Sequence, residues 1–317
     1  ETNETPGAQA QRSYLWTPGL KVFVAFPQSP VRGSYNTGDR VFAVYADQLV
    51  ELASDGTYVP RGTVANDGKA VSIYASAIEL FIVSGGSAYS FVLATNVLTD
   101  VTSLLAGIPL MGGYGDGYFA VMFVDSNKFQ TSAILDGTTW PGIQVNEVSV
   151  FPENNRSLIF NHRELWIMGE RHIQPYQDTG SDEIYDPPQG TLIEKGCGAT
   201  FAPARADNSI FWVDEDERGA RTCWRAEGYT PIRISTHAVE TALSSYASIT
   251  DLASYAYQDS GHLFWQLYIP NTDCSWVFDV GENLWHKRAA WNETTGTFGP
   301  HASWNQVYAF GKQLVGD

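Results

Sequence analysis

The stretch Gly115-Asp116-Gly117-Tyr118-Phe119-Ala120-Val121 joins a tight polar turn to a short strand of aromatic and small apolar residues. Glycine reaches positive φ without strain, and Asn or Asp hydrogen-bonds its own backbone, so such a turn favours a β-hairpin. The same turn-and-strand pattern recurs along the chain. The strands that carry it are Val41–Val44, Leu80–Val83, Tyr118–Val121, Leu165–Met168, Ile210–Val213, Leu263–Gln266 and Val307–Phe310.

The spacing of these copies predicts the architecture. Their first residues are separated by 39, 38, 47, 45, 53 and 44 positions. A repeated unit of this size cannot bury its apolar face alone, so it must pack on its neighbours, and strand-built units of about forty residues are typical of propeller blades. We therefore predict an all-β protein, a β-propeller of six to seven blades with little helix. Seven copies fit either seven blades or six blades and an extra hairpin.

The ends of the chain lead to a prediction of one domain. Residues 1–16 are predicted to form a flexible N-terminal arm, since the first dozen residues are polar and rich in Gly, Pro and Gln, and residues 17–317 form the propeller. A propeller needs its last blade closed, and Lys21–Val24 is the predicted closing strand; alternatively, the chain is a fragment of a longer protein, truncated at its C-terminus. The single helical pattern is Thr236–Leu243, with Ser235 or Thr236 as its predicted N-cap.

The charge balance bears on the partners. The chain has a net charge of −16, with 19 Lys and Arg against 35 Asp and Glu. A protein that grips nucleic acid needs a basic face to neutralise phosphates, and this composition is the opposite. The simplest interpretation of this negative charge is that it keeps the protein soluble. A more specific interpretation is that acidic residues form the wall of a channel, where they repel phosphate and let DNA pass. The sequence has no apolar run of about eighteen residues, so we predict no membrane span.

The sequence carries no recognisable catalytic or metal motif. Three widely spaced cysteines, Cys197, Cys223 and Cys274, are predicted to be buried reduced thiols rather than disulfide or metal partners, which favours assembly in a reducing cytoplasm. The six histidines have no zinc-ligand spacing, and no phosphate-binding, dinucleotide-binding or serine-hydrolase motif occurs. We predict no catalytic residue, no metal and no cofactor.

One stretch keeps an enzymatic alternative open. Asp136-Gly137-Thr138-Thr139-Trp140 is a degenerate form of the Ser-x-Asp-x-Gly-x-Thr-Trp box of sialidase-type propellers. The box is a folding element in those enzymes, and the chemistry needs an arginine triad with a Tyr/Glu nucleophile, or a pair of carboxylates. The alternative reading is therefore a carbohydrate-binding or glycoside-hydrolysing β-propeller.

Two acidic segments are candidate functional surfaces. The run Asp214-Glu215-Asp216-Glu217 follows the fifth repeat strand, where a solvated hairpin tip is expected, and it lacks the ligand spacing of an EF-hand calcium loop. The segment 178–190 contains Asp178, Asp182 and Glu183 and then paired prolines, so it cannot be a central strand and is predicted to protrude as a loop. Both segments are predicted to face a lumen or a neighbouring subunit.

A succession of motifs in the second half of the chain adds a family resemblance. These motifs are His162–Trp166, Gly169-Glu170, Tyr176–Gly180, Ile193–Ala199, Asp207–Trp212, Gly228–Ala238, Tyr255–Gln258, Gly261-His262, Trp276–Asp279, Leu284–Arg288 and Leu314–Asp317. The series resembles the packaged-DNA stabilisation proteins, or tail nozzles, of short-tailed double-stranded-DNA phages. The resemblance is looser between residues 17 and 137, where mainly the blade pattern carries it.

The resemblance implies a structural virion protein and no enzyme. Members of this family assemble as a ring, a hexamer, below the portal and adaptor rings of the virion tail, after synthesis in the host cytoplasm. Expected partners are other copies of the chain, the portal-adaptor ring, a tail needle or tip protein, a tailspike or fibre, and genomic DNA that passes through the lumen without tight binding. The ring would retain packaged DNA and guide ejection. Family chains continue past the terminal Val-Gly-Asp, which leaves blade closure open here.

Overall fold

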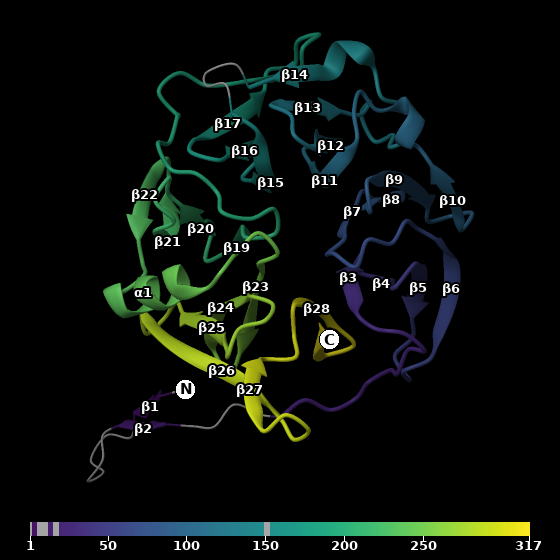
Figure 1. Cartoon of the computed structure of the whole chain (residues 1–317). Coiled ribbons are helices and arrows are strands. Elements are labelled where there is room, and N and C mark those ends of the chain that lie inside the picture. The colour runs from purple at the N-terminus through teal and green to yellow at the C-terminus, as the bar shows by residue number, and fades with distance from the viewer. Residues whose placement is uncertain (1, 5–11, 15–18, 149–152) are drawn as a thin grey trace.

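The computed structural model describes residues 2–4, 12–14, 19–148 and 153–317. Within them, successive antiparallel sheets stand side by side around a common axis, and Figure 1 shows the resulting ring. Six sheets have at least four strands each and are the blades of a six-bladed β-propeller. The predicted all-β propeller with little helix is confirmed.

Each blade runs outward from the axis in chain order. The strands of the first three blades are β3 (Val31–Asn36), β4 (Val41–Tyr45), β5 (Gln48–Leu52), β6 (Tyr58–Thr63); β7 (Ser72–Ala75), β8 (Glu79–Ser84), β9 (Ser87–Val92), β10 (Val97–Asp100); and β11 (Pro109–Gly115), β12 (Tyr118–Phe123), β13 (Lys128–Thr131), β14 (Val145–Glu147). Those of the next three are β15 (Asn155–Asn161), β16 (Glu164–Gly169), β17 (Ile173–Asp178), β18 (Tyr185–Asp186); β19 (Ala204–Ala206), β20 (Ser209–Glu215), β21 (Arg221–Glu227), β22 (Thr230–Arg233); and β23 (Ala253–Asp259), β24 (His262–Tyr268), β25 (Ser275–Asp279), β26 (Leu284–Asn292), β27 (Thr297–Pro300).

The first six repeat strands are the second strands of these blades, and they form the core. Most of their side chains are buried on both faces, because each blade packs against a blade or the hairpin of residues 305–316 on either side. Phe81 of the second blade meets Phe119 of the third at 5.4 Å between ring centroids, and Phe211 of the fifth meets Trp265 of the sixth at 5.5 Å. Full burial of such a ring contributes on the order of 2–3 kcal/mol, so aromatic contacts between blades hold the ring together.

The predicted polar turns have the backbone that their residues favour. In the third blade, Asp116 and Gly117 have φ of +51° and +90° between β11 and β12. Asp207 and Asn208 have φ of +47° and +57° at the equivalent turn of the fifth blade. Two successive residues at positive φ match the twist of a two-residue hairpin, which is why Gly, Asn and Asp recur there.

The seventh repeat strand differs from the other six. It lies in β28 (Asn305–Ala309), which pairs only with β29 (Lys312–Gly316) among the described strands. Figure 1 places this hairpin between the sixth and first blades, with β28 near the axis. Tyr255 Oη lies 2.7 Å from Ser303 Oγ on the sixth-blade side, and Ser34 Oγ donates to Asn305 Oδ1 at 3.0 Å on the first-blade side. Of the two arrangements that seven copies allowed, the structure therefore has six blades and an extra hairpin.

The prediction that Lys21–Val24 forms the closing strand is wrong. These residues have no strand pairing; instead Phe23 stacks on Phe310 of the hairpin turn at 6.0 Å, and Phe26 stacks on Tyr45 of the first blade at 4.4 Å. The segment is an apolar strap across the junction of hairpin and first blade. Most of the predicted flexible arm, residues 1–16, lies outside the described residues; its described parts, β1 (Thr2–Glu4) and β2 (Arg12–Tyr14), pair antiparallel.

The helical prediction is confirmed as α1 (His237–Ser245), whose N-cap is Thr236, with its hydroxyl accepting from the Val239 N–H. Two 3₁₀ turns, η1 (Thr102–Leu104) and η2 (Gly142–Gln144), complete the described helical elements. The predicted protruding loop at 178–190 is only partly a loop, because Ile184 and Tyr185 are buried and β18 is the short outer strand of its blade. In the described part of the chain, no helix is long and apolar enough to cross a membrane.

Candidate functional site

The acidic run 214–217 lies where β20 turns into β21. Asp214 is partly buried and accepts a hydrogen bond from the Gly196 N–H at 3.1 Å. Glu215 forms an ion pair of 2.8 Å with Arg221, whose side chain is buried and also donates to the Leu243 carbonyl of α1 at 2.7 Å. Glu215 therefore ties the β20–β21 hairpin to α1 through Arg221, and Asp214 holds the backbone at Gly196.

The next two residues form the exposed tip of this turn. The Asp216 carboxylate accepts from the backbone N–H groups of Arg218 and Ala220, each at 2.8 Å, and so shapes the turn. Glu217 extends to the fourth blade, where it forms an ion pair of 2.6 Å with Arg171. The expectation of a solvated hairpin tip fits Asp216 and Glu217.

Among the carboxylates of the 214–217 run, Asp214 has the pKa that is shifted most. Burial raises the pKa of Asp214 to about 6, against the opposing effects of Lys195 and the Gly196 N–H. A buried carboxylate with one backbone donor keeps its proton at a higher pH than an exposed one. Part of the negative charge expected from the sequence is therefore lost under mildly acidic conditions.

The second acidic segment lies on the opposite face of the ring. The turn between β16 and β17 contains Arg171, which meets Glu217, so this turn and the 214–217 tip share one face. From there β17 runs six residues to Asp178, a span of about 20 Å. Asp182 and Glu183 follow Asp178 and are exposed. The residues of the 214–217 run thus lie together on one face, and Asp178, Asp182 and Glu183 lie together on the other.

A groove of about 340 Å³ lies beside the 214–217 tip, between the fourth and fifth blades. Its charged lining is mixed, because Arg156 pairs with Glu170 at 2.8 Å and Arg171 pairs with Glu217. Cys197 also lines the groove, and burial raises the pKa of its thiol to about 12, so it is unreactive at neutral pH. Most charges of the groove are therefore paired, and Asp216 is held by backbone N–H groups.

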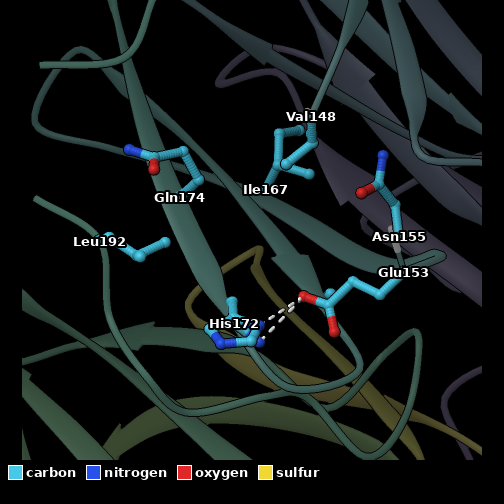
Figure 2. Close-up of a pocket in the computed structure, with 8 residues that line it drawn as sticks. Val148, Glu153, Asn155, Ile167, His172, Gln174 and Leu192 are labelled. Carbon is cyan, nitrogen blue, oxygen red and sulfur yellow. Dashed lines mark hydrogen bonds and ion pairs between the residues drawn. The ribbon is translucent and has the colours of Figure 1, made fainter. Parts of the chain in front are cut away.

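A second cavity, shown in Figure 2, is far smaller. It has a volume of about 10 Å³, room for about one water molecule, and is lined by Glu153, Asn155, Ile167 and His172 among others. Glu153 accepts hydrogen bonds from the backbone N–H groups of Arg171, at 2.8 Å, and His172, at 3.1 Å. This carboxylate holds the turn between β16 and β17, and its cavity does not fit an organic substrate.

The residues that could bind a metal or act in catalysis are spread over the propeller rather than clustered in one site. Among the described residues, no group of three His, Cys, Asp or Glu side chains is placed to hold a metal ion. The three cysteines are free and buried, as predicted. Nine arginines pair with carboxylates, within a blade or between neighbouring elements, which does not favour the arginine triad of the glycosidase alternative.

The described part of the propeller thus has no assembled metal or catalytic cluster. A protein-family model for phage stabilisation, described as the β-propeller of bacteriophage P22 Gp10, matches residues 6–317. The chain belongs to this family. Membership confirms the resemblance and makes the chain a phage structural protein. The search of curated proteins found no match.

Solved structures agree with the P22 Gp10 family on fold alone. A candidate 6-phosphogluconolactonase of Bacteroides fragilis has 13% identity and a TM-score of 0.57, covering 90% of this chain and 86% of that one. PorZ of Porphyromonas gingivalis, a surface component of a type-IX secretion system, has 10% identity and a TM-score of 0.52, covering 88% of this chain. The chain spans about a third of PorZ, 34% of its length. At these identities the similarity shows a shared propeller fold and says nothing about activity.

Sequence reasoning missed one exposed feature of this P22 Gp10 family member. The stretch around Gly296 is the turn of a hairpin between β26 and β27, where Trp291 and Phe298 pair across the strands at 4.9 Å and remain 55% and 61% exposed. The signal for the hairpin was present, because a four-residue turn that follows Asn292 and ends at Gly296 lies between the aromatic residues Trp291 and Phe298.

Proposed function

We propose that this chain is a tail nozzle subunit, which assembles with copies of itself into a hexameric ring around the DNA channel of a short phage tail. The ring would retain packaged DNA and guide its ejection. The observation that carries the proposal is the family match over residues 6–317, which covers nearly all of the chain. The partners that follow are a portal-adaptor ring, a tail needle or tip protein, and a tailspike or fibre.

The electrostatics of the chain support a conduit rather than a DNA-binding protein. The net charge is −16, and nine arginines are already paired with carboxylates in the described residues. Unpaired acidic groups repel phosphates over about 8–10 Å at moderate salt. Such a wall lets DNA slide, and retention then depends on a mechanical plug rather than on affinity.

The rigidity of the fold suits the same role. Aromatic contacts join each blade to the next from the first to the sixth, so the propeller resists deformation as a unit. A wall around pressurised DNA needs that resistance and needs no moving part of its own.

Negative-stain images of the purified chain, alone and mixed with a portal-adaptor ring, test the proposal. Rings or co-assembled particles are expected, with negligible binding of duplex DNA at about 0.15 M salt. A chain that stays monomeric with every tail component would contradict it. A clear and saturable signal on a glycan array would favour the carbohydrate-binding alternative instead.

A further inference from the structure

Arg205 is an exposed arginine whose guanidinium forms no hydrogen bond or ion pair in the described part of this acidic chain. It lies on β19, the inner strand of the fifth blade. Nine other arginines pair with carboxylates, and Arg288 donates to the Tyr257 hydroxyl. Among the described side chains, Arg218 is the other arginine that forms neither kind of bond. The positive charge of Arg205 is therefore free for a ligand.

Three tyrosines lie at the same end of the propeller axis as Arg205. Tyr35 is the last residue but one of β3, Tyr74 of β7 and Tyr114 of β11. Arg205 has the same position in β19. Each of these strands is the first of its blade, and the blades follow one another in the same way, so the four strands run in the same direction along the axis. Figure 1 shows β3 and β7 across the axis from β19.

The side chains of these four residues converge. The rings of Tyr35 and Tyr74 lie 6.2 Å apart between centroids. Burial raises the pKa of Tyr74, and the positive charge of Arg205 opposes that effect from the other side of the axis. Burial also raises the pKa of Tyr114, and Tyr35 adds to the rise. Because a neighbouring group changes a pKa only from nearby, the guanidinium and the three phenol groups lie close together.

The donors of this group are not used by the described part of the chain. The three tyrosines are half-buried, and none of their hydroxyls forms a hydrogen bond there. The two carboxylates that act on Tyr114 are engaged elsewhere, because Glu79 accepts two hydrogen bonds of its own and Asp116 pairs with Arg163 at 3.0 Å. A guanidinium and several hydroxyls that point to one place are the donor set for an oxyanion.

We propose that this end of the propeller axis binds a carboxylate, which the guanidinium of Arg205 holds and the hydroxyls of Tyr35 and Tyr74 orient. The planar guanidinium donates two parallel hydrogen bonds to the two oxygens of a carboxylate. One cation balances a single negative charge, which favours a carboxylate over a phosphate group of nearly two charges. The ligand is either a free small acid or the acidic side chain of a partner protein. The site lies within one propeller, so it does not depend on the proposed ring.

Titration of the chain with propionate, the acid that corresponds to a glutamate side chain, tests the site by ligand-observed NMR at constant ionic strength. Saturable binding is expected in the millimolar range, and Arg205→Met should weaken it at least about tenfold. Arg218→Met is the matched control, because Arg218 is also exposed and unbonded but lies at the other end of the fifth blade. Tyr74→Phe, which removes only a hydroxyl, should weaken binding by about tenfold.

Three results would overturn the site. They are no saturation below about 50 mM propionate, equal losses in Arg205→Met and Arg218→Met, and tighter binding of inorganic phosphate than of propionate. A blocked peptide, Ala-Ala-Glu-Ala-Ala, distinguishes the two sources of the carboxylate. Tighter binding of the peptide than of propionate supports a side chain of a partner protein, and weaker or equal binding supports a free acid. Formation or loss of rings leaves each of these results unchanged, so the nozzle role is tested separately.

Discussion

The side-chain amide of Asn305 donates a hydrogen bond of 2.6 Å to the carbonyl oxygen of Val31, joining positions 274 residues apart. The same amide accepts from Ser34 Oγ at 3.0 Å, so one side chain fastens β28 to β3. The Val31 N–H donates to the Asp317 carbonyl at 2.9 Å beside it. In the described part of the chain, the hairpin therefore joins the first blade through these polar bonds and through a buried cluster in which Val307 and Ala309 pack with Val41 and Ala43.

Asn305→Ala should lower the free energy of unfolding by about 1–3 kcal/mol, because it leaves polar groups at the closure without partners. Urea denaturation followed by tryptophan fluorescence measures the change. Asn36→Ala is the matched control, since the Asn36 amide also joins the hairpin to the first blade, through the Tyr308 carbonyl at 2.8 Å, but in an exposed position. We expect about 0.5 kcal/mol for the control. Equal losses for both variants would contradict a special role for Asn305.

Arg32→Met should destabilise the chain by about 3 kcal/mol or more. The Arg32 guanidinium is buried and donates to the carbonyls of Lys69, Ala46 and Ala65, at 2.7, 2.8 and 3.0 Å, besides its ion pair with Asp67. Methionine fills similar space but satisfies none of these acceptors. Differential scanning calorimetry measures the shift. Asp67→Asn, which removes only the 41%-exposed partner, should cost about 1 kcal/mol, and a larger loss there than in Arg32→Met would contradict this account.

The sequence predicted the repeats well because burial between blades is a local pattern. Each second strand is buried on both faces, and this selects the same aromatic and β-branched residues every time. The pattern does not separate inner from second strands, since both are buried, so the copy at Val307–Phe310 was grouped with strands to which it is not equivalent. Its turn residues, Phe310 and Gly311, have positive φ like the residues of the other turns, so the turn does not distinguish this copy from the other six.

Which acidic side chains of the two segments are paired with a cation was not predictable from the sequence. Glu217 is paired by Arg171, which lies on the preceding blade, and Glu215 by Arg221 across its own hairpin. The direction of the preceding strand determines the face of the ring on which each segment lies. The amino-acid composition does not give that direction.

Two buried groups should give the stability opposite pH dependences. Burial raises the pKa of Asp214 to about 6 and lowers the pKa of His286 to about 4. The folded chain then binds more protons at Asp214 than the unfolded chain between pH 4 and 6, so this group makes stability fall as pH rises. At His286 the unfolded chain binds more protons between pH 4 and 6.5, so stability rises with pH.

Asp214→Asn should therefore make the stability rise more steeply from pH 4 to 6, by about 1–2 kcal/mol after allowance for partial solvent contact. His286→Gln should make it rise less steeply over the same range. Urea denaturation at half-unit pH steps measures both slopes against the parent chain. Parallel curves for all three proteins would show that neither group changes its protonation on folding.

The two acidic faces provide the sharpest test of the nozzle proposal, because only one of them can line a channel. Glu217 and Glu183 are both exposed glutamates, but they lie on opposite faces of the propeller. Glu217→Lys and Glu183→Lys make the same change of charge, so each is the matched control for the other. In assembled rings, the variant whose residue faces the lumen should bind a short duplex, with a log–log salt slope that grows by about 0.9 for each phosphate contacted. Fluorescence anisotropy of a labelled duplex, measured against salt concentration, gives this slope.

The other variant should behave as the parent does, because its new charge lies farther from the lumen than one Debye length. If both variants gain the same affinity, the binding is to the outer surface, and neither face lines a channel.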